Sequence, residues 1–394
     1  MAGSTTQQFQ MGIPSGSPSQ GDSVEQIREV SDEMELYNPW DTPFLEWLGK
    51  AISGSAGQNY KHEFLEPDLW SKTLTVSATT AATTAETTIT LSGNTAYQAP
   101  IGGVYRNTTS DELILVTARA SDSTLTVVRD YAGSSGATMA ASATLKFMGV
   151  ARFEGSDTVY QGHPNKSAQY NYYQQHEQGF EISTQARASD VYGLDRYEYE
   201  RITLMETLKF GLEMSVLEGE RFAGSSTTEP GLMGGIYYFA TSANGAYVAS
   251  LASAALTEPH LNAALRDRVQ TVKRSRLATD VFVDPYLKMK IDSIYEGRRR
   301  DTVGGRTGGG VIDTIVNSVA TLRVHMIENM RSGQLIALSK DQIKLLHWPG
   351  HNWREGRLPS SGLTSEKHGM VGVFTMEDRA IPGQWKLTSI STSS

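Results

Sequence analysis

The sequence predicts an α+β protein of two or three lobes organised around one long helix. The segment Asp195–Phe222 has no proline and repeats its apolar residues at helical spacing, so it is expected to span roughly 40 Å. Residues 73–152 are rich in threonine and turn residues, which is typical of a small β module. Residues 231–376 alternate strand-like and helix-like segments. A chain of 394 residues also exceeds the size at which one core keeps growing.

The N-terminal region predicts an arm. Residues 1–22 are mostly Ser, Gly, Gln and Thr, a composition that cannot offset its own ordering entropy, so we expect them to lie along another subunit. Ser23 is expected to cap a short helix that ends before Pro39. A second helix is expected after Asp41 or Thr42 as the cap, with Pro43 in its first turn.

Two extended segments flank the β module. Residues 59–70 and 169–183 are β-compatible, which places the module at the tip of a long two-stranded excursion. Turn signals rich in Gly separate short strands inside it, namely Thr87–Leu91, Glu112–Arg119, Ser123–Asp130 and Thr144–Phe147.

The long helix at Asp195–Phe222 acts as a spine in this prediction. Asp195 and Glu198 have the spacing of a capping box, and Gly224 supplies the stop. Two neighbouring stripes form a wide apolar face, made by Ile202, Met205, Leu212, Val216, Tyr197, Leu204 and Leu208. Charged residues fall largely outside these stripes, namely Arg201, Glu206, Lys209, Glu213 and Glu220.

Beyond the spine, helices and strands alternate. Helices are expected at Glu258–Arg276 and Pro285–Tyr295. The glycine-rich segment Gly297–Gly310 is a loop. Strands are expected at Ile236–Phe239, Val281–Val283, Val311–Val316, Ala320–Met326, Gln334–Leu338, Ile343–His347 and Met370–Met376.

Composition excludes several classes of protein. The chain has no cysteine, so it has no disulfides, thiolate metal sites or cysteine nucleophiles. No run of apolar residues reaches 18, and the first twenty residues resemble no secretion signal, so we expect neither a membrane span nor secretion. The net charge of −8 is uneven, because residues 1–60 are acidic and residues 266–306 are basic. These charges are either solvated helix faces or an arm of one copy meeting the basic face of another.

Catalytic, cofactor and metal motifs are missing from the sequence. Gly304–Gly310 matches neither a dinucleotide fingerprint nor a phosphate loop. His176 and Glu177 lack the second histidine of a zinc-protease motif and lie in a segment that looks extended. His347 and His351 straddle a Trp-Pro-Gly turn, which breaks the helical register that ligands four apart would need. We therefore expect no catalytic residue, no cofactor and no metal, and a chain built for association.

Several local strings and their order resemble the major capsid protein of tailed bacteriophages, whose Johnson fold is shared with herpesvirus capsid floors and encapsulin shells. The strings run from about residue 40 to 380. They are DTPF at Asp41–Phe44, HEFLEPDL at His62–Leu69, NYYQQ leading to FEIST at Asn171–Thr184, LEGE at Leu217–Glu220, GLMGGI at Gly231–Ile236 and SGQLIALSKDQIKLL at Ser332–Leu346.

The resemblance implies a Johnson-type domain order. Residues 1–57 correspond to the N-terminal arm and 58–185 to the extended E-loop, which carries the inserted β domain 73–152. Residues 186–230, with spine helix 195–222, form the peripheral domain, and 231–325 the axial domain. Residues 326–394 would be return strands of the peripheral domain and the C-terminal tail. The minimal family pattern lacks the insert, so its role and orientation stay open.

The resemblance also implies contact residues between subunits. The arm junction contributes Asp41 and Phe44. The flanks of the E-loop contribute His62, Glu63, Tyr172 and Phe180. The family's axial loop points toward the local symmetry axis, and here that loop holds Arg298, Arg299, Arg300, Asp301 and Arg306. The arginine triplet either pairs with acids of another subunit or meets phosphate, and the glycines would let one loop fit both fivefold and sixfold rings.

The expected function is a major capsid protein that assembles into hexamers and pentamers of an icosahedral head around double-stranded DNA. The resemblance implies a portal and decoration proteins as partners, and a separate scaffolding protein, because no coiled segment precedes the arm. Assembly would occur in the host cytoplasm and the protein would reside in the virion, with DNA enclosed without sequence-specific binding. Two alternatives stay open: an encapsulin-like shell enclosing protein cargo, and a hydrolase or lyase with a β accessory domain.

Overall fold

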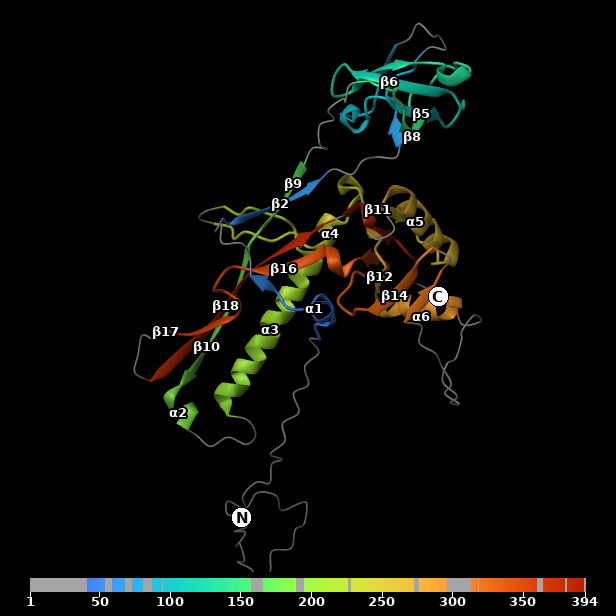
Figure 1. The fold of residues 1–394 in the computed structure, drawn as a ribbon. Coiled ribbons are helices and arrows are strands. Elements are labelled where there is room, and N and C mark those ends of the chain that lie inside the picture. The colour runs from blue at the N-terminus through green and yellow to red at the C-terminus, as the bar shows by residue number, and fades with distance from the viewer. Residues whose placement is uncertain are drawn as a thin grey trace, which may run out of the picture.

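The structure, a computed structural model, describes residues 41–53, 59–67, 73–80, 87–93, 95–156, 166–188, 195–225, 228–272, 276–295, 313–317, 319–359, 364–379 and 381–392. The predictions for the arm helix and for loop 297–310 lie outside these residues. Figure 1 shows the arrangement: a long helix beside a sheet, a second mixed sheet with its helices, and a separate β module. No helix in the described part of the chain is long and apolar enough to cross a membrane.

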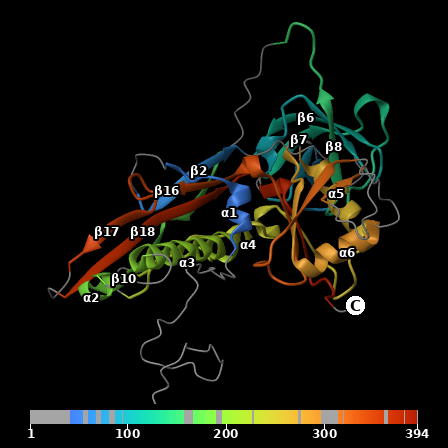
Figure 2. The same cartoon turned by 90° about the horizontal axis from the view of Figure 1, so that it is seen from below.

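The spine is helix α3, Arg196–Glu218, which lies along strand β10, Gln174–Ser183, and strand β18, Ser365–Asp378 (Figures 1 and 2). The predicted capping box is wrong, because the side chain of Asp195 makes no capping hydrogen bond. The predicted end at Phe222 is also wrong. The helix ends at Glu218, and Phe222 forms a β-bridge with Leu232. Position 219 requires glycine, because a Cβ there would lie 2.4 Å from the carbonyl oxygens of Ser215 and Met233.

The apolar face of α3 is buried only in its second half. Leu208, Leu212 and Val216 from the predicted stripes are buried, and the earlier stripe residues are half-buried. Glu213, predicted on the wet face, is fully buried. Its carboxylate accepts hydrogen bonds from two backbone N–H groups of helix α1, Pro43–Leu48, and these bonds compensate its burial.

The sheet beside the spine has the order β1-β16-β18-β10, with β17 paired to β18. Strand β18 continues well beyond the predicted Met370–Met376 because it pairs with β10 over its first part and β16 over its last. The short helix α2, Thr184–Ala188, follows β10. The remaining strands are β1, Ile52–Ser53; β16, Ile343–His347; and β17, Arg354–Leu358.

The second sheet is mixed, with the order β11-β19-β15-β12-β14-β13. Two of its strands, β15 and β19, come from 326–394, which the sequence had placed with the peripheral domain. They pair antiparallel to each other and β15 also pairs with β12, so this sheet draws strands from beyond residue 325. The bounds are β11, Tyr247–Ser250; β12, Asp280–Val283; β13, Thr314–Val316; β14, Thr321–Met326; β15, Leu335–Leu338; and β19, Trp385–Thr388.

Helices flank the second sheet as the sequence predicts. Helix α6, Pro285–Tyr295, has its predicted bounds, and α5, Glu258–Thr271, ends five residues before the predicted Arg276. Residues 236–239 are a helical turn, α4, Ile236–Phe239, and not the predicted strand. Gly235 packs against the last turn of α3, and the turn then buries Ile236, Tyr237 and Phe239 in the core shared by both sheets, so packing overrides β propensity.

The β module has a hydrophobic core of its own. Its sheet has the order β3-β8-β5-β6-β7-β4, and a bridge between Val76 and Leu91 joins the two ends into a small closed barrel. Strand β5 was not predicted. The bounds are β3, Thr73–Thr75; β4, Thr88–Thr90; β5, Gly103–Asn107; β6, Leu113–Arg119; β7, Thr124–Val128; and β8, Thr144–Val150.

A two-stranded stem leads to the barrel, as the sequence predicts. Strand β2, Lys61–Pro67, pairs antiparallel with β9, Lys166–Tyr172, over its whole length. Short 3-10 helices occupy Ala96–Gln98, Tyr131–Gly133, Ser242–Asn244, Lys340–Gln342 and Ile381–Gly383.

Candidate assembly surfaces

The stem brings three of the predicted contact residues together. His62 and Glu63 lie on β2, and Tyr172 lies on β9, where it pairs with Lys61 in the strand register. The Tyr172 ring stacks on Tyr60 with centroids 5.6 Å apart. Glu63 is exposed and forms an ion pair with Lys61. This part of the stem is a surface of tyrosine rings and charges.

Cations cover the tyrosine rings of the stem. The Lys61 ammonium lies 4.2 Å and the Arg221 guanidinium 3.8 Å from the ring centroid of Tyr170. Arg221 also donates a hydrogen bond to the Tyr170 carbonyl at 2.9 Å and lies 4.9 Å from the ring of Tyr238. Such cation–π contacts stabilise a ring that stays partly open to solvent. The stem is therefore braced against the segment that follows the spine.

His62 joins the stem to the long strand β18. Its Nε2 lies 2.6 Å from Oε1 of Glu377, and both side chains are largely buried. Burial opposes ionisation of Glu377, but the hydrogen bond from His62 and the nearby Arg379 outweigh it, so the pKa of Glu377 is lowered. The predicted contact residue His62 is thus already engaged inside its own chain.

Asn171 is the residue that fixes the base of the stem, and sequence reasoning missed it. It is fully buried on β9. Its amide nitrogen donates to the carbonyls of Gly234 and Met376 at 3.0 and 2.9 Å. Its amide oxygen accepts from the N–H groups of Gly234 and Tyr172 at 2.7 and 2.9 Å. One side chain therefore ties the stem, β18 and the segment before α4 together. A lone asparagine within an aromatic strand was the available signal.

The arm junction is fixed by Glu213 of the spine. Its Oε2 accepts from the N–H groups of Phe44 and Leu45 at 3.1 and 3.2 Å, and its Oε1 accepts from Asn329 at 3.1 Å. Burial raises the pKa of Glu213 despite these bonds. Thr42, one of the two predicted caps, is the N-cap residue, but its side chain makes no capping hydrogen bond. The spine thus supplies the acceptor for the first N–H groups after the arm.

Asp41 and Phe44 have different environments at this junction. Asp41 is exposed, and its backbone carbonyl accepts a hydrogen bond from Asn329 at 3.3 Å. Phe44 is fully buried in the chain's own core, with its ring centroid 5.3 Å from that of Phe282. Asp41 is available to a neighbour, whereas the Phe44 side chain is enclosed in this conformation.

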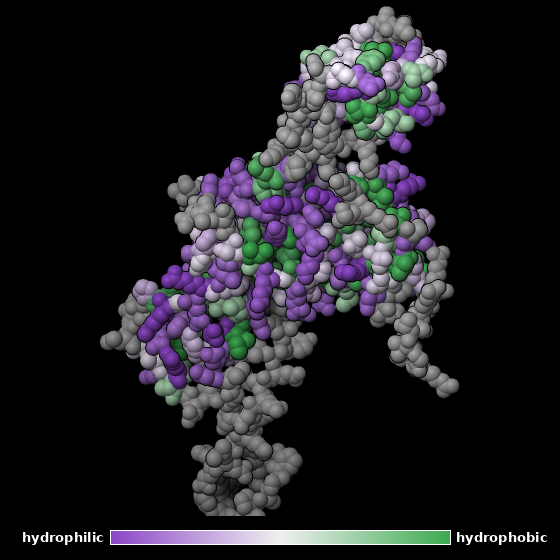
Figure 3. All heavy atoms as spheres, in the orientation of Figure 1, coloured by the Kyte–Doolittle hydropathy of each residue, from purple (hydrophilic) through white to green (hydrophobic). Residues whose placement is uncertain are grey.

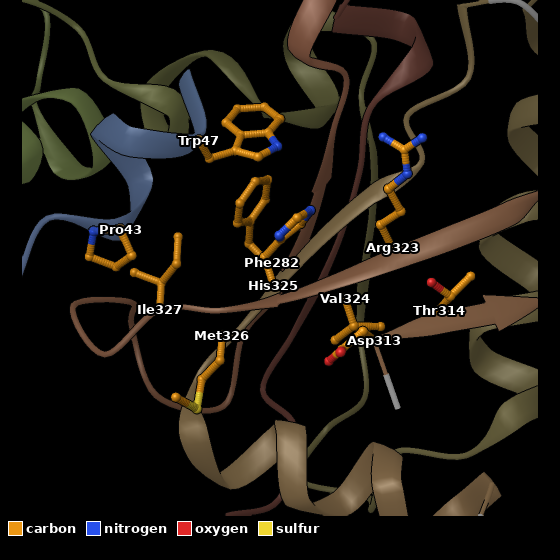
Figure 4. A pocket seen from close by; sticks show the side chains of 10 residues that line it. All are labelled: Pro43, Trp47, Phe282, Asp313, Thr314, Arg323, Val324, His325, Met326 and Ile327. Atoms are coloured by element: carbon orange, nitrogen blue, oxygen red, sulfur yellow. The ribbon is translucent and has the colours of Figure 1, made fainter. Parts of the chain in front are cut away.

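A groove of about 390 Å³ opens beside α1. In Figure 4, Pro43 and Trp47 from α1 face Phe282 of β12 and His325 of β14. The His325 ring stacks on Phe282 with centroids 5.2 Å apart, and Trp47 meets Phe282 edge-on at 4.7 Å. The groove offers aromatic faces, and its polar lining residues are Asp313, Thr314, Arg323 and His325.

Phe180 lies at the far end of β10. Its ring stacks on His368 and meets Tyr197 of the spine edge-on, each with centroids 5.6 Å apart. The Tyr197 hydroxyl donates to Glu355 at 2.6 Å, and that bond, with a second from Arg201, lowers the pKa of Glu355. Phe180 therefore helps to hold β10 and β18 against the start of the spine.

The predicted contact residues form no single site. His62, Glu63 and Tyr172 share the stem, Asp41 and Phe44 share the arm junction, and Phe180 is at the opposite end. The loop residues Arg298, Arg299, Arg300, Asp301 and Arg306 lie outside the described residues. Within the ranges that the structure describes, no group of three His, Asp or Glu side chains could hold a metal ion. His176 lies in strand β10, which confirms that its segment is extended.

Comparisons with known proteins cover nearly the whole chain. The family model described as SU10 major capsid protein matches residues 4–383. No curated protein matches the chain. A solved capsid of a native GTA particle superposes with a TM-score of 0.55 at 9% identity, covering 96% of this chain and 99% of that chain.

Two other solved structures resemble part of the chain. A cyanophage A-1(L) capsid gives a TM-score of 0.45 at 9% identity over 61% of this chain and 84% of that one. An encapsulin complex from Synechococcus elongatus gives 0.43 at 9% identity over 59% and 79%. Of these three likenesses, the one to the GTA capsid has a TM-score above 0.5 and shows the fold.

Proposed function

The chain belongs to the SU10 major capsid protein family, and we propose from this premise that its copies form the hexamers and pentamers of an icosahedral phage head that encloses double-stranded DNA. The observation that carries the proposal is the family match over residues 4–383. It is supported by the Johnson fold, which the chain shares with a capsid over nearly its full length. The protein is a structural component of the virion capsid.

The mechanism of assembly is geometric in this proposal. The arm, residues 1–57, and the E-loop, 58–185, reach neighbouring copies, while the spine and the second sheet form the rigid body between them. Glu213 supports the arm part of the proposal because it holds the first N–H groups of α1 on the spine. Asn171 supports the E-loop part because it anchors the stem to β18 and to the segment before α4. The arm and the E-loop therefore both begin at backbone that hydrogen bonds hold to the rest of the chain.

The domain assignment is part of the same proposal. Residues 186–230 belong to the peripheral domain and 231–325 to the axial domain, to which strands β15 and β19 are added because they pair in its sheet. The rest of 326–394, with β16, β17 and β18, belongs beside the spine. Portal, separate scaffolding and decoration proteins are the expected partners, and DNA is enclosed without sequence-specific contacts.

The arginine loop, Gly297–Gly310, is proposed to adapt ring size at the local axes. Its glycines permit different backbone shapes in fivefold and sixfold rings. Acids of adjacent copies, such as Asp301, would balance the converging arginines. Replacing Arg298, Arg299 and Arg300 together by alanine should change particle stability in a salt-dependent manner and leave packaged DNA length unchanged. Shorter DNA in equally stable particles would show instead that the loop contacts DNA.

Expression of the chain alone or with its neighbouring genes, followed by negative-stain microscopy and sedimentation, tests the function. Shell-sized particles are expected. A monomer in sedimentation would contradict the proposal and favour the hydrolase or lyase alternative. Nuclease-protected DNA inside mature particles would support a phage head, whereas particles filled with a cargo protein would favour an encapsulin-like shell.

A further inference from the structure

Asp378 carries a carboxyl group that is completely enclosed by the protein. Hydrophilic residues cover most of the visible face of the body (Figure 3), as expected where charged side chains remain in solvent. Asp378, by contrast, is 0% exposed. It is the last residue of β18, where its strand partner is Ile343 of β16. An ionised carboxylate in such a place is costly unless hydrogen-bond donors or a cation compensate its charge.

Hydrogen bonds to Asp378 are too few for an ionised carboxylate. Its Oδ1 accepts one hydrogen bond, from Nε2 of Gln384 at 2.5 Å. Its Oδ2 is buried and has no donor in the described part of the chain. Asp284, another buried aspartate, is different, because its two oxygens accept three hydrogen bonds. Their donors are Leu287, Ser332 and Gly333. Asp378 therefore lacks the donors that stabilise a buried negative charge.

The charged side chains around Asp378 do not compensate a negative charge either. Glu66 of the stem is the charged group that acts on Asp378, and it is negative. The charged groups on the adjoining elements are exposed or directed to other partners, namely Arg379, Glu377, Lys340, Asp341, Lys344 and Lys386. Ionisation of Asp378 would therefore place a second negative charge near Glu66, in a site that water does not reach.

The partner of Asp378 has a buried acceptor of its own without a donor. Gln384 is 2% exposed, and no described residue donates a hydrogen bond to its Oε1. A carboxylic acid and a primary amide are complementary, because the acid O–H can donate to the amide oxygen while the amide N–H donates to the acid carbonyl. A single proton on Oδ2 of Asp378 would therefore satisfy both acceptors. Burial, helped by the charge of Glu66, raises the pKa of Asp378 to about 8, which favours this proton at neutral pH.

We propose that Asp378 is a neutral carboxylic acid joined to the Gln384 amide by two hydrogen bonds, and that this pair is a pH-sensitive link between the two sheets of the body. Asp378 ends β18 of the sheet beside the spine. Gln384 directly precedes β19 of the second sheet, and its carbonyl accepts a hydrogen bond from Tyr247 of β11 at 3.1 Å. Loss of the proton would remove one of the two side-chain hydrogen bonds and bury a charge near Glu66. Alkaline pH is therefore expected to loosen the contact between the sheets at this point.

Infrared spectroscopy of the full chain, with aspartate ¹³C-labelled at its side-chain carboxyl, tests for the proton directly. At pH 6 the wild type should show the band of a protonated carboxylic acid, because exposed aspartates are ionised there. The band should disappear as pH rises through about 8. D378N should lack the band, whereas D341N, the matched control at an exposed aspartate, should retain it. E66Q should move the loss of the band to lower pH, because it removes the neighbouring negative charge.

Hydrogen exchange of the unassembled full chain tests the link between the sheets. Asparagine at position 378 can keep both hydrogen bonds to Gln384, because its amide nitrogen donates to Oε1 and its oxygen accepts from Nε2. Peptides covering residues 381–388 should therefore be equally protected at pH 6 and pH 9 in D378N, once exchange is corrected for its intrinsic pH dependence. In the wild type their protection should fall roughly tenfold over this range, the effect of one lost buried hydrogen bond.

Two results would overturn the inference. One is a wild-type spectrum at pH 6 without a protonated aspartate band, and this measurement decides even if D378N does not fold. The other is a protection of residues 381–388 that changes with pH equally in the wild type and in D378N, which would show that the proton does not control the link.

Discussion

Replacing Arg129 by methionine should strongly destabilise the inserted barrel. Arg129 and Glu112 are both fully buried, and Arg129 donates to the two oxygens of Glu112 at 2.5 and 2.7 Å and to the carbonyl of Ala137 at 2.5 Å. Methionine keeps the apolar part of the arginine side chain but leaves the Glu112 carboxylate with only the backbone donors of Asp130 and Ala137. Breaking one side of a buried pair costs about 3–5 kcal/mol.

Hydrogen exchange measured by mass spectrometry on the full chain is the appropriate assay, since it reports the barrel separately from the two sheets. A loss of that size should accelerate exchange of barrel peptides roughly 100-fold to 4000-fold, at about 1.4 kcal/mol per tenfold, and leave peptides of α3 unchanged. The double variant E112L/R129M is the control. It removes both charges, so it should exchange more slowly than R129M.

The pH dependence of R129M gives an independent check of the same reasoning. Burial opposes ionisation of Glu112, but the hydrogen bond and charge of Arg129 outweigh it and lower the pKa of Glu112. The wild-type pair therefore stabilises the fold at pH values above the ordinary carboxyl pKa. This contribution is lost as pH falls through the lowered pKa of Glu112 in the folded state. Without Arg129, burial raises that pKa, so the deficit of R129M should shrink in mild acid. A deficit below about 1 kcal/mol, or one independent of pH, would refute this account.

Three further predictions concern the body of the protein and the arm. Burial raises the pKa of Asp378 from 3.8 to about 8. Between these pH values the folded state holds a proton on Asp378 that the unfolded state releases. The free energy of unfolding should therefore fall as pH rises through this range, by at most about 1.4 kcal/mol per pH unit. D378N should flatten this slope in denaturant unfolding curves, and an unchanged slope would assign it to other groups. N171A should lower the free energy of unfolding by about 2–4 kcal/mol, because it leaves buried backbone groups of Gly234 and Met376 unpaired. If N171A is as stable as the wild type, water has replaced the side-chain amide. Deleting residues 1–22 should leave thermal unfolding of the unassembled chain unchanged but reduce particle yield, and an undiminished yield would contradict the role given to the arm.

Long periodic segments of the sequence predicted their elements well. Pro285–Tyr295 and the paired stem were found because proline in a first turn and alternating strands are local signals. The closed barrel was predicted as a β module, but β5 was missed, since Gly103–Asn107 is short and its burial depends on neighbours on both sides.

The errors concern residues whose environment is set by distant parts of the chain. Glu213 looked like a solvent-facing residue because its position on the helix is polar, yet the N–H groups that it accepts from lie 169 and 168 positions away. Residues 236–239 have strand-like composition, but they form a helical turn that buries Ile236, Tyr237 and Phe239 in the core. Asn171 could not be found from spacing, because its four hydrogen bonds join three separate segments.

The place where the chain enters and leaves the barrel allows another folded domain to replace the barrel. Pro67 and Lys166 are partners in the stem register, and Thr73 and Lys146 are partners at the first and last strands of the barrel. Paired strands lie about 5 Å apart, so the two ends of the stem that carry the insert lie close together. A foreign domain whose own termini lie equally close can replace residues 74–150 without altering the spacing of the stem. The stem is thus a natural grafting point for displaying other folded domains on a shell.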